Sequence, residues 1–342
     1  MKEKIESRLT EAGLKVPEIL FPDTDLRKWS CIACDQYTSR PDYWEKVVSL
    51  VGDAPSSLDL MMPEAWIGDE KRKAHEEEIP GKMASCLSNG ILNKLPAGFM
   101  YVKRQTRTGI RKGLLALLDL SRYEYAPGNK ALCRATEGTV EERLPVRIEI
   151  RKKALFEMPH VMVLYQDEDF LLANCLDEGT KGMASLYDFE LMMGGGNIKG
   201  FHITGEDALE KIADVMLKLK ERAEDGMLYA VGDGNHSLAA AKRCGDGYAL
   251  VELVNVYDPA LVFEPIHRLK KDGDVVDYIH GKDECLRLAG LLGYEAVIMP
   301  DYPKDRLFKD VIEKGVLPKK TFSMGQADDK RFYLECCMRE GK

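Results

Sequence analysis

Residues 227–243 read MLYAVGDGNHSLAAAKR, and this stretch places a buried strand directly before a helix. Residues 228–231 form an apolar run typical of a buried strand, and residues 238–242 consist mostly of strong helix formers. Between them, Gly232 and Gly234 predict a tight turn. A helix that starts straight after such a turn points its first N–H groups outward, with the positive end of the helix dipole behind them. The junction is therefore suited to binding an anion, most often a phosphate.

Two side chains of this turn can carry chemistry. Asp233 supplies a carboxylate and His236 an imidazole, the groups that proton transfer or metal positioning requires. We predict both as catalytic residues. The predicted phosphate-binding residues of the turn are Gly232, Gly234, Asn235 and Ser237. The alternative is a structural turn in which Asp233 or Asn235 caps the helix.

A second polar stretch lies about 100 residues earlier. Thr136, Glu137 and Thr139 come before a helix expected to begin near residue 145. Arg143, Arg147 and Arg151 follow at intervals of four, which places them on one stripe of the helix. A functional interpretation assigns the guanidinium groups to phosphates and Glu137 to a base or metal ligand. In the alternative, Arg147 and Arg151 pair with surface acids such as Glu149.

The length and composition limit the possible classes of protein. A chain of 342 residues is long enough for one large or two ordinary domains. The net charge of −8 disfavours nucleic acid binding over a broad surface. No apolar run approaches the roughly 20 residues that span a bilayer, so we expect no membrane partner. Nine cysteines, with no apolar signal segment, predict a cytoplasmic protein without a disulfide framework.

The patterns predict alternating helices and strands. The pair Cys31 and Cys34 has the spacing of a metal or redox site, but no second pair follows, which favours buried small residues. A hairpin is expected from 99–106 and 110–120, and a capping-box-like start at Thr204 precedes a long helix to Ala223. Further helices are expected at 5–12, 41–51, 70–92, 282–292 and 302–314, and further strands at 161–165, 186–193, 201–204, 248–257, 294–299, 321–324 and 331–338.

The motif at residues 231–238, VGDGNHSL, resembles the DGxHR signature of the ParB/sulfiredoxin-like superfamily. It is more similar to the DG(N/H)H motif of a bacterial family, domain of unknown function 1015. The resemblance extends to residues 33–39, to 136–139 with 142–145, and to 265–268. It adds Asp35, Gln36 and Thr38 as pocket-wall residues, and His267 and Arg268 as phosphate-binding residues.

The resemblance implies an α+β protein with a mixed-sheet core similar to the ParB/sulfiredoxin-like fold. N-terminal helices elaborate this core, with a main domain at 1–270 and a small C-terminal α+β subdomain at 271–342. Sulfiredoxin chemistry needs a cysteine where this chain has Asn235, and the net charge disfavours DNA partitioning. There remains a similarity to the free serine kinases of the superfamily, which transfer phosphate from a nucleotide to a small hydroxyl compound.

A kinase-like interpretation implies a nucleotide ligand, accompanied by Mg²⁺, and a small-molecule partner. The motif of this chain ends in Ser237 where that of the kinases has arginine, so Arg143, Arg147 or Arg268 would supply the charge that holds the phosphate. The competing interpretation is a non-catalytic regulatory module that binds a nucleotide or phosphate. The kinase-like interpretation needs a base at the acceptor hydroxyl, for which Glu137 is the candidate, whereas the non-catalytic interpretation needs none.

Overall fold

The computed structural model describes residues 2–32, 37, 40–66, 69–139, 141–159 and 161–339. Their centre is a mixed sheet of ten strands, nine of which form one continuous path. In spatial order these are β10 (Tyr187–Leu191), β11 (Gly196–Ile203), β4 (Phe99–Thr106), β5 (Gly109–Asp119), β13 (Tyr248–Asn255), β9 (Met162–Tyr165), β12 (Tyr229–Asp233), β7 (Cys133–Ala135) and β6 (Tyr123–Glu124), with β1 (Leu14–Lys15) beside β5. Each strand from β10 to β13 is antiparallel to its neighbour in this order. The pairs β13 with β9, β12 with β7 and β7 with β6 are parallel.

The hairpin predicted at the centre of the sheet is confirmed. β4 and β5 pair in register from Met100 opposite Leu115 to Thr106 opposite Gly109. Gly109 has a φ of +140°, a conformation that a residue with a side chain rarely adopts, and it closes the turn. Both strands are buried over most of their length because they lie inside the sheet.

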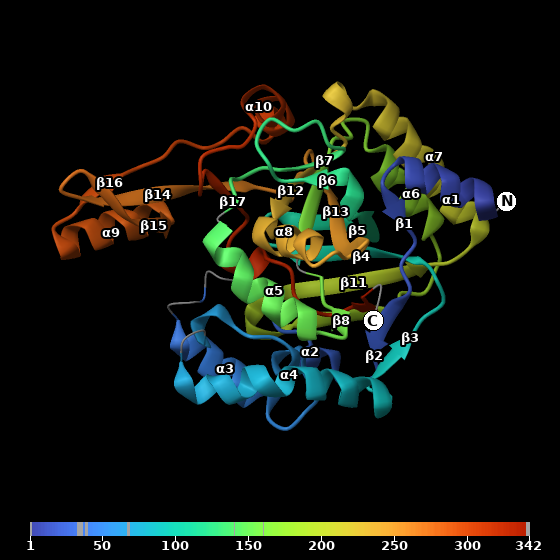
Figure 1. Cartoon of the computed structure of the whole chain (residues 1–342), viewed down its shortest axis with the longest axis horizontal. Coiled ribbons are helices and arrows are strands. Elements are labelled where there is room, and N and C mark those ends of the chain that lie inside the picture. Colours follow the sequence, from blue (N-terminus) through green and yellow to red (C-terminus); the bar gives the residue numbers. More distant parts are fainter. Residues whose placement is uncertain are drawn as a thin grey trace.

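Helices α1 (Lys2–Glu11), α6 (Leu171–Gly179) and α7 (Glu206–Arg222) pack together on one face of this sheet (Figure 1). As predicted, α7 buries Ile212, Met216 and Leu219. Its predicted capping box is wrong, because the cap residue is Gly205, with no side-chain cap. Thr204 lies one residue too early to cap the helix. Acidic residues in the first turn of α7 still oppose the helix dipole.

The opposite side carries the N-terminal helices. These are α2 (Leu26–Trp29), α3 (Pro41–Val51) and α4 (Glu70–Ser88). They share a core with a small antiparallel sheet, ordered β3 (Leu92–Lys94), β2 (Ile19–Pro22), β18 (Cys336–Met338) and β8 (Phe156–Glu157). Figure 1 shows α3 and α4 as a layer below the main sheet. The second strand of the chain and the last therefore meet in one sheet.

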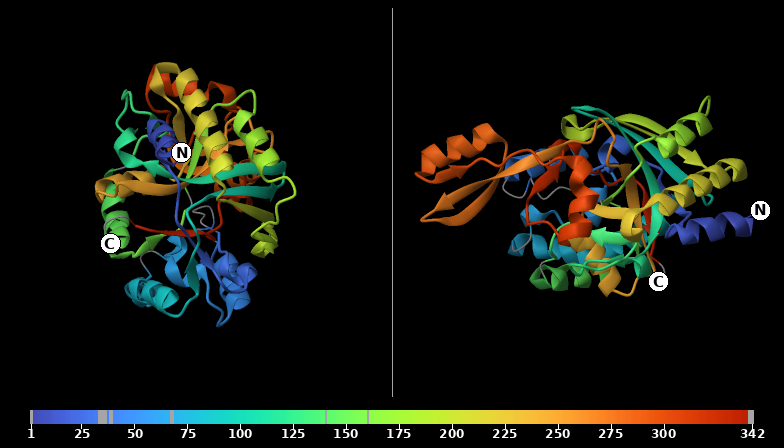
Figure 2. Two further views of the ribbon diagram at one scale, coloured as in Figure 1. Left: turned by 90° about the vertical axis from the view of Figure 1, so that its right-hand side faces the viewer. Right: turned by 90° about the horizontal axis from the view of Figure 1, so that it is seen from above.

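An arm projects from the body, as Figures 1 and 2 show. It consists of β14 (Phe263–Lys271), β15 (Asp274–His280), β16 (Glu295–Val297) and α9 (Lys282–Leu292). The arm has a small core of its own, which includes Leu269, Ile279 and Cys285. β17 (Phe322–Met324) pairs with the first residues of β14 and so ties the base of the arm to the body.

The residues predicted as a C-terminal subdomain are shared among three parts of the structure. Residues 271–297 belong to the arm, and α10 (Leu307–Lys314) packs with residues of the main sheet. β18 pairs with β2 and β8. A domain boundary at residue 270 stays a prediction. The strand predicted at 331–338 is shorter than expected, because residues 331–335 cross the main sheet and place charged side chains on it.

Ionic side chains are buried together where residues 331–335 lie against the main sheet, and we call them the buried ion cluster. Its members are Arg104, Arg111, Glu252, Arg331 and Glu335, each at most 3 % exposed. Arg331 Nη1 lies 3.1 Å from Glu252 Oε2, and Arg331 also pairs with Glu335. Burial, together with the nearby positive charge of Arg111, lowers the pKa of Arg104 to about 9. The cluster separates two apolar cores on the same face of the sheet.

Two negative findings concern the described residues alone. No helix among them is both long and apolar enough to cross a membrane. All eight cysteines in this part of the chain are free thiols. Cys31 is fully buried, and its burial raises the pKa of the thiol. This fits the interpretation as a small buried residue, and Cys34 lies outside the described residues.

Candidate functional site

The strand-to-helix junction has the predicted geometry. β12 ends at Asp233, Gly234 adopts φ +85° and ψ 26°, and α8 (Asn235–Arg243) follows. Leu238 N donates to Gly234 O at 3.0 Å, the first hydrogen bond of the helix, so residues 235–237 form its first turn. Gly234 is the cap residue, without a side-chain cap, and Asp233 Oδ1 instead accepts from Gly234 N at 3.0 Å. The alternative in which Asp233 or Asn235 caps the helix is therefore wrong.

Both glycines of the turn are explained by local packing. A Cβ on Gly232 would lie 2.4 Å from Met324 Sδ and 2.9 Å from Leu164 Cγ. Gly234 has the left-handed conformation, and a Cβ there would lie 2.9 Å from Val161 Cγ2. Side chains of the protein, and not a ligand, thus occupy the space that a Cβ would need at these two glycines. The glycines alone carry no argument for a ligand.

Thr136 and Asn235 join the two polar stretches of the sequence. Parallel pairing of β7 with β12 sets Ala135 beside Val231, so the residues after β7 lie next to the start of α8. Thr136 Oγ1 donates to Val231 O at 2.6 Å, and Thr136 N donates to Asn235 Oδ1 at 3.3 Å. Both side chains are buried. Their role here is to hold the loop with Glu137 against the junction.

Glu137 is a carboxylate of this region with a shifted pKa. Its burial raises the pKa of its carboxyl, and the nearby negative charge of Asp233 raises it further. The charges of Lys320 and Lys330 act in the opposite direction, and Glu137 Oε1 accepts from Lys320 N at 3.2 Å. A carboxyl with a raised pKa is better matched to proton transfer near neutral pH.

Asp233 pairs with a lysine that the sequence did not indicate. Lys330 Nζ lies 3.2 Å from Asp233 Oδ2, and its side chain is 7 % exposed. Lys320 lies between Glu137 and Arg268, because Arg268 Nη2 donates to Lys320 O at 2.9 Å. We call Glu137, Asp233, Lys320 and Lys330 the junction cluster. No local pattern indicated either lysine, because both lie in irregular segments more than 80 residues from the motif.

The other predicted site residues have different positions. The Thr139 hydroxyl is buried without a hydrogen-bond partner among the described residues. His236 is the second residue of α8 and is half-buried. His267 lies in the arm, where its Nδ1 accepts from Met299 N at 3.1 Å. Asp35, Gln36 and Thr38 lie outside the described residues, as does the side chain of Arg143.

The family of the chain is shown by comparison. The family described as "Protein of unknown function (DUF1015)" matches residues 18–336. The chain belongs to this family. No curated protein and no solved structure matches it. The matched range includes the junction cluster and the arm, and it ends at the first residue of β18.

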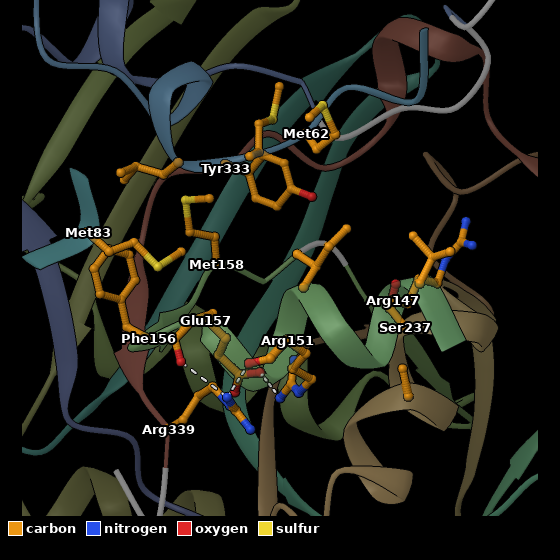
Figure 3. Close-up of a pocket in the computed structure, with 16 residues that line it drawn as sticks. Met62, Met83, Arg147, Arg151, Phe156, Glu157, Met158, Ser237, Tyr333 and Arg339 are labelled. Carbon is orange, nitrogen blue, oxygen red and sulfur yellow. Dashed lines mark hydrogen bonds and ion pairs between the residues drawn. The ribbon is translucent and has the colours of Figure 1, made fainter. Parts of the chain in front are cut away.

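Arg147, Arg151 and Ser237 of this DUF1015 protein line a cavity beside the junction (Figure 3). Its volume is about 260 Å³. Arg151 does not pair with Glu149. Instead, Arg151 Nε lies 2.6 Å from Asp246 Oδ2, and its Nη2 lies 2.5 Å from Glu157 Oε2. The guanidinium group of Arg151 is thus neutralised within the protein. Arg147 belongs to the cavity wall next to α8.

The carboxylates of the junction do not form a complete metal site. Among the described residues, no group of three or more His, Cys, Asp or Glu side chains could hold a metal ion. Mg²⁺ is usually bound by one or two protein carboxylates together with water and substrate phosphates. Asp233 could supply such a carboxylate, so the donor set fits Mg²⁺ that arrives with a nucleotide and takes its other ligands from phosphate and water.

Proposed function

We propose that this protein transfers the terminal phosphoryl group of a nucleotide to a small hydroxyl compound at the junction cluster. One observation carries the proposal. Glu137, whose pKa is raised by burial, lies beside the Asp233–Lys330 ion pair at the positive end of α8. This arrangement combines a proton acceptor with a binding site for a phosphate at the start of α8.

In the proposed reaction, the acceptor oxygen forms a bond to phosphorus as the bond to the bridging oxygen of the nucleotide breaks. The acceptor hydroxyl gives its proton to the Glu137 carboxylate. The first turn of α8 and the ammonium group of Lys330 stabilise the negative charge of the transferring group. Mg²⁺, when bound, supplies further neutralisation of the phosphate oxygens. Phosphoryl transfer depends mainly on such positioning and charge stabilisation.

Two further observations support the proposal. The buried Thr139 hydroxyl without a partner is a polar group that a ligand could satisfy. The motif at 231–238 is similar to that of the ParB/sulfiredoxin-like superfamily, and we propose that the core of the main sheet is of that type. Arg268 is proposed to act by holding Lys320 and not by direct contact with phosphate, since its Nη2 donates to Lys320 O.

The test is Glu137→Gln, which keeps the shape of the side chain and removes the base. We expect turnover with the best of a panel of small hydroxyl compounds to fall about 10²- to 10⁴-fold. Nucleotide affinity, measured by calorimetry, should be retained. Glu149→Gln is the matched control, because this exposed glutamate pairs with Lys152 on the surface of helix α5 (Leu144–Lys153). Unchanged nucleotide binding with no turnover in either protein would instead establish the non-catalytic module.

A further inference from the structure

The arm presents an aromatic side chain that is held in place and still exposed. Tyr278 of β15 is 41 % exposed. It lies opposite Arg268 of β14, whose Cζ atom is 4.7 Å from the centre of the Tyr278 ring. A guanidinium group over the face of an aromatic ring is attracted by the charge distribution of the ring. Arg268 therefore fixes the ring, while the side chain stays open to solvent.

Tyr278 and Arg268 lie on the face of the arm sheet that α9 does not cover. Their chain neighbours Ile279 and Leu269 pack with Cys285 of α9 in the core of the arm. Successive residues of a strand point to opposite faces of the sheet, so Tyr278 and Arg268 point away from α9. A flat ligand can therefore approach the ring without displacing the helix.

The base of the arm is fixed to the body next to the junction. Phe263 of β14 pairs with Met324 of β17, and a Cβ on Gly232 of the junction would lie 2.4 Å from Met324 Sδ. The rings of Phe263 and Phe322 are stacked with their centres 4.0 Å apart, and the Tyr302 ring lies 5.2 Å from that of Phe322. In Figure 1 the arm leaves the body beside β17 and β12. This packing holds the arm at a defined position relative to the junction.

Hydrogen bonds also join the arm to the junction cluster. The guanidinium group of Arg268 donates to Ile266 O and, at 2.9 Å, to Lys320 O. Lys320 N in turn donates to Glu137 Oε1 at 3.2 Å. Because both hydrogen bonds involve the backbone of one residue, the centre of the Tyr278 ring lies at most about 16 Å from Glu137 Oε1. An extended nucleoside triphosphate covers a distance of this order, since a ribose and two phosphates separate its base from its terminal phosphate.

We propose that the base of the nucleotide stacks on Tyr278, so that the arm selects a nucleoside triphosphate over a bare polyphosphate. The inference rests on the proposed function, which puts the terminal phosphate at the junction cluster. Stacking on an aromatic side chain accepts any base, because every base has a π-face. Arg268 is a positioning residue, since it holds both the ring and Lys320. The nucleotide thus bridges the arm and the body.

The experiment compares the affinities of ATP and inorganic tripolyphosphate by calorimetry. Tripolyphosphate has the phosphates of ATP but no base. We expect Tyr278→Ala to weaken ATP by at least about fivefold, the effect of losing one stacked base, and to leave tripolyphosphate unchanged. Tyr278→Phe keeps the ring and should retain the wild-type affinity for ATP. Val276→Ala is the matched control and should change neither affinity, because Val276 is 48 % exposed on the same strand and carries no ring.

A fluorescent base reports stacking directly. The triphosphate of 2-aminopurine riboside loses fluorescence when its base stacks on another ring, so saturating wild-type protein should quench it and saturating Tyr278→Ala should not. Equal quenching by both proteins would overturn the inference. Equal losses of ATP and tripolyphosphate affinity in Tyr278→Ala would also overturn it, because the ring would then act only through Arg268 and the junction cluster.

The outcomes separate this inference from the proposed function. Tyr278-dependent binding of ATP without transfer to any hydroxyl compound would leave the stacking platform standing and remove the proposed reaction. Glu137-dependent transfer from ATP, with wild-type affinity for ATP in Tyr278→Ala, would leave the reaction standing and remove the stacking platform.

Discussion

Arg331→Met removes the central cation of the buried ion cluster. Arg331 is 3 % exposed and pairs with Glu252 and Glu335, which are 1 % and 0 % exposed. Burial would lower the pKa of Arg331, but the charges of Glu335 and Glu252 raise it, so the pairing favours the charged form. Breaking a buried ion pair on one side typically costs about 3–5 kcal/mol, because the partner charge stays buried. We expect the free energy of unfolding to fall by about this amount.

The assay is urea unfolding followed by thermal unfolding. With an unfolding entropy of about 2.1 cal/mol/K per residue, 342 residues give about 0.7 kcal/mol/K, so a loss of 3–5 kcal/mol lowers Tm by about 4–7 °C in a single transition. Arg287→Met is the control, because Arg287 and Glu284 form an exposed pair worth about 0–1 kcal/mol. A loss in Arg331→Met no larger than in the control would refute the reasoning. Adding Glu335→Gln should recover part of the loss, because it removes a carboxylate left without its cation while Glu252 stays close to Arg111.

Three shorter predictions concern the junction. Lys330→Met, which removes the ammonium group beside Asp233, should weaken nucleotide binding by about tenfold in calorimetry, and unchanged affinity would remove Lys330 from the phosphate seat. Gly232→Ala should cost about 1–3 kcal/mol in urea unfolding because the new Cβ meets Met324, and a loss that persists in Gly232→Ala with Met324→Val would contradict this cause. The raised pKa of Glu137 means that wild-type stability falls as pH rises from the unfolded value of 4.5 through the folded pKa. Glu137→Gln should therefore be more stable than wild type at neutral pH and not below pH 4.5, whereas an equal difference at both pH values would show that the effect is not ionisation.

The parts of the fold that could be predicted are those encoded within short stretches. The hairpin of β4 and β5 follows from two apolar runs around Gly109, and α8 follows from the alanine-rich run after Gly234. The strand predicted at 331–338 begins only at Cys336, for a physical reason. Arg331 and Glu335 are charged, and nothing in their neighbourhood shows that partners from β13 and their own segment would bury them.

In the candidate site, too, only the features encoded within short stretches of sequence could be predicted. The junction with Asp233 and the loop with Glu137 were both found, since each has a local pattern of residues. Lys330 was not found, because it reaches Asp233 only when the segment after η9 (Ala327–Asp329) is held against the sheet by Arg331. The predicted phosphate seat therefore depends on the buried ion cluster, although no residue of that cluster belongs to the motif. Loss of Arg331 should consequently weaken nucleotide binding even at temperatures where the protein stays folded, because Lys330 loses its anchored neighbour.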